Sequence, residues 1–118
     1  MEFYYHEVER DVLILVADGG LNVDTADQFV SDLERLIEAG ITKIIVDCFK
    51  LEYISSYGIG VLMRLHRKLK RHGGDVRLAA VKGMLVKALS LVRLNQVLSI
   101  YPDTNRARLS FRPLTQPE

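Results

Sequence analysis

Residues 53 to 60 read YISSYGIG, two adjacent serines and a tyrosine followed by two glycines one residue apart. The run before them, TKIIVD at residues 42–47, is short, β-branched and apolar, which is typical of a central strand covered on both faces. The run after them carries apolar residues at helical spacing. The segment is therefore a turn that leads from a buried strand into an amphipathic helix.

The helix after this turn is expected over residues 57–72, where the apolar stripe ends at the sequence HGG. The stripe consists of Gly58, Val61, Leu62, Leu65 and Leu69. Further on, the pattern predicts a strand at 75–81, a helix at 83–94 and a short strand at 97–101, with Asp103 capping a last helical turn. The helix at 83–94 is expected to bury one face, made of Leu85, Ala88, Leu89 and Val92.

Upstream of the turn, residues 3–9 and 12–17 are β-prone and closely spaced, which predicts two antiparallel strands joined by a tight hairpin. The glycines of DGGLNVD then break the strand pattern, and a helix follows, with Asp24 or Thr25 placed to cap it and Gly40 placed to end it. Its apolar positions are Ala26, Phe29, Val30, Leu33, Leu36 and Ile37.

The order of these elements predicts an α/β fold: a mixed β-sheet with an N-terminal hairpin and helices packed on the sheet. The length is that of one domain, which we expect to span residues 1–112. Residues 113–118 contain prolines and are expected to form a flexible tail.

The residues themselves leave several roles open for the serines of the turn. Nucleophilic catalysis needs a base, but the segment does not match the G-x-S-x-G elbow of hydrolases, and His66 and His72 lie in the basic helix. The two glycines favour a phosphate cradle only weakly, although any phosphate at a helix N-terminus is stabilised by the helix dipole. The simplest role is a cap, in which a serine oxygen accepts a hydrogen bond from the backbone N–H of Gly58 or Ile59.

The composition places the chain among ordinary globular domains, with 48% hydrophobic and 26% charged residues. A net charge of +1 lacks the basic excess of nucleic-acid-binding domains, so no nucleic-acid partner is expected. Cys48 is the only cysteine, which excludes a disulfide within one chain and fits a reducing compartment. The acidic N-terminus is unlike a signal peptide and no run is long enough to cross a membrane, so we expect a cytoplasmic protein without membrane insertion.

The segment from Ile44 to Val81 resembles the core of STAS domains, the family of bacterial anti-sigma factor antagonists and of the cytoplasmic domains of sulfate transporters. The family pattern is a strand ending in Asp, a short loop with a hydrophobic residue, and D-S-[ST]-G-[LI]-G at the start of a helix. The matching residues are Asp47, Ile54, Ser56, Gly58, Ile59 and Gly60. Two positions depart from it: Ser55 stands where the family has Asp, and Tyr57 where Ser or Thr is usual.

The likeness extends over residues 8–102. GGLNVDTAD resembles the family's turn into its first helix, and RHGG resembles the sequence that ends the helix after the serine turn. The resemblance implies a non-catalytic anti-sigma factor antagonist that binds an anti-sigma factor or serine kinase when it is unphosphorylated. Ser56 matches the family's phosphorylatable serine, with Ser55 and Tyr57 as second choices. The resemblance further implies that phosphorylation releases the partner and that a cognate phosphatase restores the unmodified state.

A different possibility is a scaffold that is never phosphorylated. In this alternative the domain assembles with other signalling proteins or binds a nucleotide, and Ser56 only caps its helix. Substitutions at Ser56 distinguish the two, since only a switch depends on the charge at that position.

A partner surface is expected around the turn, made of Ser55, Ser56, Tyr57, Gly58, Ile59, Met63, Arg64, Arg67 and Asp24. Ile59 and Met63 lie off the buried stripe and four residues apart, and exposed apolar residues beside charges are typical of a docking face. The alternative is that these two side chains merely flank the core. Asp18, Asp24 and Asp47 are expected near the turn if the strand-end loops converge there, although Asp47 could instead cap its own loop.

The helix after the turn also carries a basic run of Arg64, Arg67, Lys68, Lys70 and Arg71. We interpret this run as a solvated face whose cations gather at the helix C-terminus, where the dipole favours them. The spacing of His, Cys and carboxylate residues indicates no metal site, and no cofactor is expected.

Overall fold

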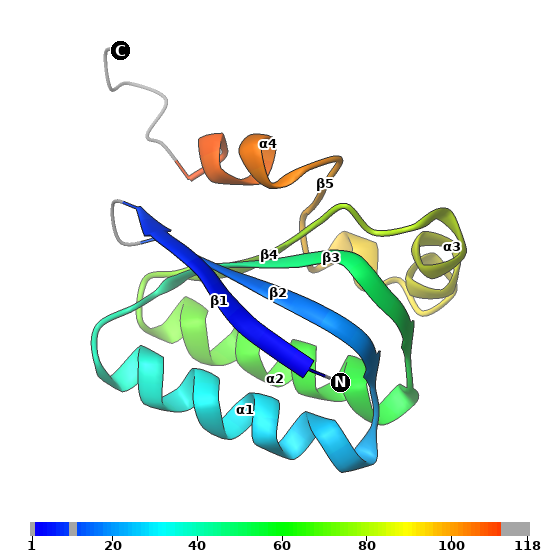
Figure 1. The fold of residues 1–118 in the computed structure, drawn as a ribbon, viewed down its shortest axis with the longest axis horizontal. Coiled ribbons are helices and arrows are strands. Elements are labelled where there is room, and N and C mark those ends of the chain that lie inside the picture. Colours follow the sequence, from blue (N-terminus) through cyan, green and yellow to red (C-terminus); the bar gives the residue numbers. More distant parts are fainter. Residues whose placement is uncertain (1, 10–11, 112–118) are drawn as a thin grey trace.

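The computed structural model describes residues 2–9 and 12–111 (Figure 1). In chain order its elements are β1 (Glu2–Glu9), β2 (Val12–Leu21), α1 (Val23–Glu38), β3 (Lys43–Ile54), α2 (Ser56–Arg71), β4 (Asp75–Ala79), α3 (Gly83–Leu91), a 3₁₀ helix (Leu94–Gln96), β5 (Ile100–Tyr101) and α4 (Thr104–Leu109).

The described strands form one sheet in the order β1-β2-β3-β4-β5. β2, β3, β4 and β5 run parallel to one another, and β1 lies antiparallel to β2 along the edge. The predicted α/β class is therefore confirmed. The turn of the expected hairpin, residues 10 and 11, and the expected tail at 113–118 lie outside the described residues.

Helices cover both faces of the sheet (Figure 1). α1 and α2 lie side by side on one face, over a large apolar core that includes Leu15, Phe29 and Leu65. α4 lies on the opposite face, over a smaller cluster that includes Ile14 and Ile45. Both faces of β2 and β3 are thus buried, which explains the nearly continuous apolar runs in the centre of these strands.

Cys48 belongs to the larger core and is 1% exposed. Burial, together with the nearby charge of Asp47, raises the pKa of its thiol to about 12. The thiol is therefore protonated at neutral pH and packs as a small apolar group. Since the thiolate is the form that reacts or binds metals, Cys48 is expected to be unreactive.

β2 and β3 are both longer than the sequence pattern predicts. The glycines of DGGL do not break β2, which continues to Leu21, and β3 does not end near Asp47 but continues to Ile54. The extensions pair with each other in parallel, with Gly19 opposite Leu51, and two irregularities in register interrupt the pairing. β4 pairs with β3 only from Lys43 to Asp47. The end of β3 is therefore part of a two-stranded ribbon beyond the main sheet.

The predicted helix at 26–37 is confirmed, but its cap is neither Asp24 nor Thr25. Asn22 is the N-cap: its side-chain oxygen accepts the N–H groups of Asp24 and Thr25 at 2.9 and 3.3 Å. The Thr25 hydroxyl in turn accepts the N–H of Asn22 at 3.1 Å, which completes a capping box. At the other end Gly40 follows the helix with φ at +103°, as a terminating glycine should.

The prediction for the helix at 83–94 is partly wrong. α3 ends at Leu91, and only Leu85 and Leu89 of the expected face are buried. Ala88 is exposed although it lies within α3, and Val92 is exposed because the chain leaves the helix before it. Leu94 and Leu98 fill the core in their place. β4 is also shorter than expected, ending at Ala79, whereas Asp103 caps α4 as predicted, accepting the Arg106 N–H at 2.7 Å.

Candidate functional site

Ser55 is the residue that turns the chain from β3 into α2. Its backbone N–H donates to the carbonyl of Leu21 at 2.9 Å, which fastens the turn to the end of β2. Its hydroxyl oxygen accepts the N–H of Gly58 at 3.1 Å, so Ser55 is the N-cap of α2. The prediction that Ser56 caps the helix is therefore wrong, because Ser55 does so.

Ser56 is the first residue of α2 and is exposed. Because the capping bond is made by its neighbour, the Ser56 hydroxyl is not needed to begin the helix. A group added to this oxygen would project into solvent near the positive end of the helix dipole, where negative charge is stabilised. The site is therefore suited to carry a phosphate without disturbing the fold.

The two serines should contribute differently to the stability of the domain. Ser55→Ala should lower the free energy of unfolding by about 1 kcal/mol, because one backbone donor of the first turn loses its acceptor. Ser56→Ala should change it by less than about 0.5 kcal/mol, as for exposed surface substitutions. Thermal and denaturant unfolding of the two variants compare them directly. A larger loss for Ser56→Ala than for Ser55→Ala would contradict this division of roles.

Tyr57 links the start of α2 to α1. Its hydroxyl donates to the carboxylate of Asp27, which lies on the neighbouring helix α1. This hydrogen bond is the main cause of the raised pKa of Tyr57, which nearby Arg64 partly offsets. The phenol is therefore neutral at physiological pH and holds one side of the turn in place.

Tyr53 lies on the other side of the turn, at the end of β3. Its hydroxyl accepts the side-chain amide of Asn22 at 2.6 Å. Its ring covers Gly20 so closely that a Cβ at that position would lie 2.1 Å from the ring carbons. Gly20 therefore permits an aromatic ring to pack across the ribbon, and Tyr53 still leaves 48% of its surface exposed.

The expected docking residues are only partly available. Ile59 and Met63 are half-buried and pack against the large core, as in the alternative where they merely flank it. Arg64 and Arg67 are exposed on α2, and Gly58 is buried. The apolar groups exposed near the turn are instead Val23, Tyr53 and Tyr57.

Sequence reasoning missed Val23, Asp27 and Tyr53. A signal for Tyr53 was present in the paired glycines at 19 and 20, since glycine in a strand often marks a close approach by another group.

The three candidate aspartates do not gather at the turn. Asp47 lies seven residues before the end of β3 and accepts the N–H of Phe49 at 3.0 Å, so it caps its own segment as the alternative held. Asp18 lies within β2, paired across the ladder with Lys50. Asp24 is exposed in the first turn of α1, the helix that contacts Tyr57 through Asp27.

His66 in α2 and His72, the C-cap of that helix, lie away from the serines. His66 is ten residues beyond Ser56, about 15 Å along the helix axis, and its Nε2 lies 3.6 Å from the carboxylate of Asp75. His72 contacts the carbonyl of Lys68 at 3.0 Å. Neither can accept a proton from the Ser56 hydroxyl, since a general base must lie within hydrogen-bond reach.

Among the helices of the described chain, none is both long and apolar enough to span a membrane. Within residues 12–111, no three His, Cys, Asp or Glu side chains gather where they could share a metal ion.

Fold and site together define a small α/β domain that presents an exposed serine at a strand-to-helix turn. The chain belongs to the STAS domain family, which matches residues 6–107. The family is one of non-enzymatic regulators, in agreement with the expectation that the chain is not an enzyme.

Individual relatives agree with this assignment. A Thermotoga maritima protein provisionally named as an anti-sigma factor antagonist is 25% identical over 108 residues, 91% of this chain and 96% of that protein. The anti-sigma F factor antagonist of Paenibacillus polymyxa is 26% identical over 98 residues, 82% and 84% of the two chains. A crystal structure of a T. maritima protein with the same provisional name superposes with a TM-score of 0.87, at 26% identity and over 94% and 95% of the chains.

Proposed function

We propose that this protein is an anti-sigma factor antagonist that works as a phosphorylation switch. In its unmodified form it binds an anti-sigma factor that is also a serine kinase, and phosphorylation of Ser56 releases the partner. A phosphatase returns the domain to its binding form. We place the protein in the cytoplasm, as one domain over residues 1–112, with no nucleic-acid partner.

The observation that carries this proposal is the exposed Ser56 hydroxyl beside a cap made by Ser55. Phosphorylation would bring close to two negative charges to a position that is neutral in the unmodified domain. The helix dipole tolerates that charge, so the fold persists. A partner surface packed over the same hydroxyl has to accommodate or desolvate the phosphate, so binding is lost.

Phosphosite mapping by mass spectrometry, on protein isolated from its own cells before and after a nutrient change, tests the proposal. We expect a phosphate on Ser56 whose occupancy changes with conditions. Absence of that phosphate under all conditions, or a phosphate confined to Ser55 or Tyr57, would overturn the switch in favour of the scaffold.

The partner surface that we propose comprises Val23, Tyr53 and Tyr57 around Ser56, with Arg64 at its rim. The three apolar side chains are exposed by 61%, 48% and 40% and come from α1, β3 and α2. Aromatic residues with one polar end are enriched where protein partners bind, because they offer large contact area and a hydrogen-bonding group.

Tyr53→Ala should weaken binding of the anti-sigma factor by at least about tenfold, because the ring offers contact area at the centre of this surface. Leu109→Ala is the matched control, since Leu109 is 44% exposed but lies in α4 on the opposite face of the sheet. Calorimetric titration of the partner measures both affinities. Equal affinities of the two variants would place the partner elsewhere.

A further inference from the structure

We propose that α3 and the segment after it bind the surface of an anionic phospholipid membrane. The outward side of α3 carries Met84, Ala88 and Leu91, which share one side of the helix because they stand at positions i, i+4 and i+7. Met84 is 87% exposed and Leu91 86%, the two highest values among the large apolar side chains of the described residues. Figure 1 shows α3 at the margin of the fold, where a surface outside the molecule can reach this side.

α3 is apolar on both of its sides. Leu85 and Leu89 lie in the large core, and a surface helix usually turns polar residues to solvent on the side opposite its core residues. Lys87 is the only charged residue of α3. Val92 and Val97, which follow the helix, are exposed as well. An exposed apolar surface beside charge is typical of a binding face.

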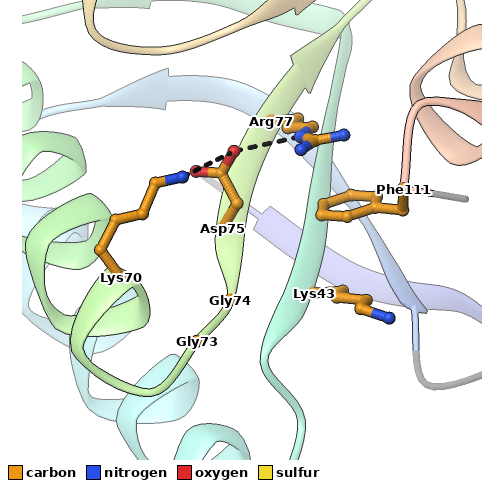
Figure 2. Close-up of a pocket in the computed structure, with 7 residues that line it drawn as sticks. All are labelled: Lys43, Lys70, Gly73, Gly74, Asp75, Arg77 and Phe111. Carbon is orange, nitrogen blue, oxygen red and sulfur yellow. Dashed lines mark hydrogen bonds and ion pairs between the residues drawn. The ribbon is translucent and has the colours of Figure 1, made fainter. Parts of the chain in front are cut away.

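The stretch of chain around α3 has cations and no acidic residue. Residues 76–102 contain four basic residues and no Asp or Glu, although the whole chain has 16 basic and 15 acidic residues. Arg77 is already paired, since its Nε lies 3.1 Å from the carboxylate of Asp75 (Figure 2). The other three are exposed and form no ion pair with a carboxylate of the described residues: Lys82, Lys87 and Arg93. The charge of this face is therefore complementary to an anionic surface.

Two of these cations occupy positions that the fold itself does not favour. Lys82 is the N-cap of α3, where the helix dipole disfavours positive charge, and its side chain makes no capping hydrogen bond. Arg93 has φ at +60°, a left-handed conformation that glycine and asparagine adopt at lower cost. Anionic headgroups beside α3 would favour a cation at both positions.

The types of side chain on this face favour a membrane over a protein partner. Protein interfaces are enriched in aromatic residues and depleted of lysine, whereas the α3 face has no aromatic ring and two lysines among its three free cations. Apolar side chains can enter the acyl boundary of a bilayer, while lysine stems extend along apolar surface and place the ammonium groups among the headgroups. With so few apolar side chains the contact should be peripheral, reversible and weakened by salt.

The α3 face shares no residue with the surface proposed for the anti-sigma factor. Membrane binding through α3 needs neither a phosphate on Ser56 nor the partner protein. The inference therefore goes beyond the proposed switch, and either one can fail without the other.

Sedimentation of the whole chain with vesicles tests the proposal. We expect binding to vesicles of phosphatidylcholine and phosphatidylglycerol that decreases as salt is added, and no binding to phosphatidylcholine alone. Lys87→Gln should weaken binding about fivefold, since one cation near an anionic surface is lost. Leu91→Gln should weaken it at least as much, because the glutamine side chain does not enter the acyl boundary.

Two matched controls alter the same kinds of side chain at other places. Leu109→Gln removes an exposed leucine from α4, and Arg67→Gln removes an exposed cation from α2. Both should retain vesicle binding. Thermal unfolding verifies that each variant folds, which we expect because the replaced side chains are exposed.

A tryptophan can report where the membrane touches the protein, since the chain has none of its own. Met84→Trp should show blue-shifted fluorescence with the anionic vesicles, because the indole enters a less polar environment. Leu109→Trp should show no shift. A shift in Leu109→Trp but not in Met84→Trp would place the membrane on the wrong face and refute the proposal.

Three further results would also overturn it. Absence of binding to the anionic vesicles would leave an acidic protein as the class of ligand for this face. Equal losses in Arg67→Gln and Lys87→Gln would mean that general positive charge, not α3, attracts the lipid. Light scattering of the chain without vesicles covers the last alternative: a dimer that dissociates in Leu91→Gln would place a second copy on α3.

Discussion

Ser56→Asp is expected to lower affinity for the anti-sigma factor by at least about a hundredfold. An unpaired charge buried at an interface costs roughly 3–5 kcal/mol, and every 1.4 kcal/mol is a factor of ten in affinity. The variant should nevertheless fold normally, because an acidic residue in the first turn of α2 is compatible with the helix dipole. Calorimetric titration with the partner, combined with thermal unfolding of each variant, measures both quantities.

Two control variants separate the effect of the charge on binding from the effects of side-chain size and of position in the chain. Ser56→Asn has nearly the shape of aspartate without the charge, and should retain most of the affinity. Ser55→Asp moves the charge by one residue, to the N-cap, where aspartate can accept the same N–H of Gly58. It should also retain binding, since Asp is the residue that the family pattern has at this position. Equal losses in Ser56→Asn and Ser56→Asp would show that bulk, not charge, disrupts the complex.

Gly58→Ala should destabilise the domain by about 1–3 kcal/mol, the usual cost of overpacking. A Cβ at Gly58 would lie 2.7 Å from the carbonyl oxygen of Leu21 and 2.9 Å from its Cγ. That carbonyl accepts the N–H of Ser55, so it cannot move without loosening the turn. The start of α2 should therefore shift away from β2, and binding of the partner should weaken with stability.

Gly60→Ala is the matched control for this prediction, because nothing lies within 4 Å of its Cβ position. Alanine in a helix interior is favoured over glycine by about 1 kcal/mol, so this variant should be slightly more stable than the natural chain. Thermal unfolding of the two variants should show transitions displaced in opposite directions. A stabilised Gly58→Ala variant would mean that the packing of α2 on β2 adapts easily.

The sequence predicted correctly those helices and strands whose apolar pattern lies within a single segment of the chain. α1 and α2 follow from apolar residues at helical spacing, and the central parts of β2 and β3 from apolar runs. The extensions of these strands were missed, because glycines at 19 and 20 and charges at 50 and 52 are typical of loops. They remain extended only because each pairs with the other, and that pairing links residues more than thirty positions apart.

The candidate site shows the same division. The serine turn was located from its place between a strand and a helix, but the choice of cap depended on backbone geometry that separates two adjacent serines. Ile59 and Met63 were predicted to be exposed because the helical pattern gives their position on α2, but it does not show which other elements pack beside them. Tyr53 was missed because its packing partner, Gly20, lies on another strand.

The ribbon formed by the ends of β2 and β3 has a consequence for how such domains can diversify. Beyond Asp47, β3 buries Cys48 and Leu51 and exposes Phe49, Glu52 and Tyr53. The outward residues can therefore be exchanged without repacking the core, while the inward ones keep the serine at its place. Related domains can therefore acquire different partners through substitutions at the exposed residues of this ribbon, while the buried residues stay the same.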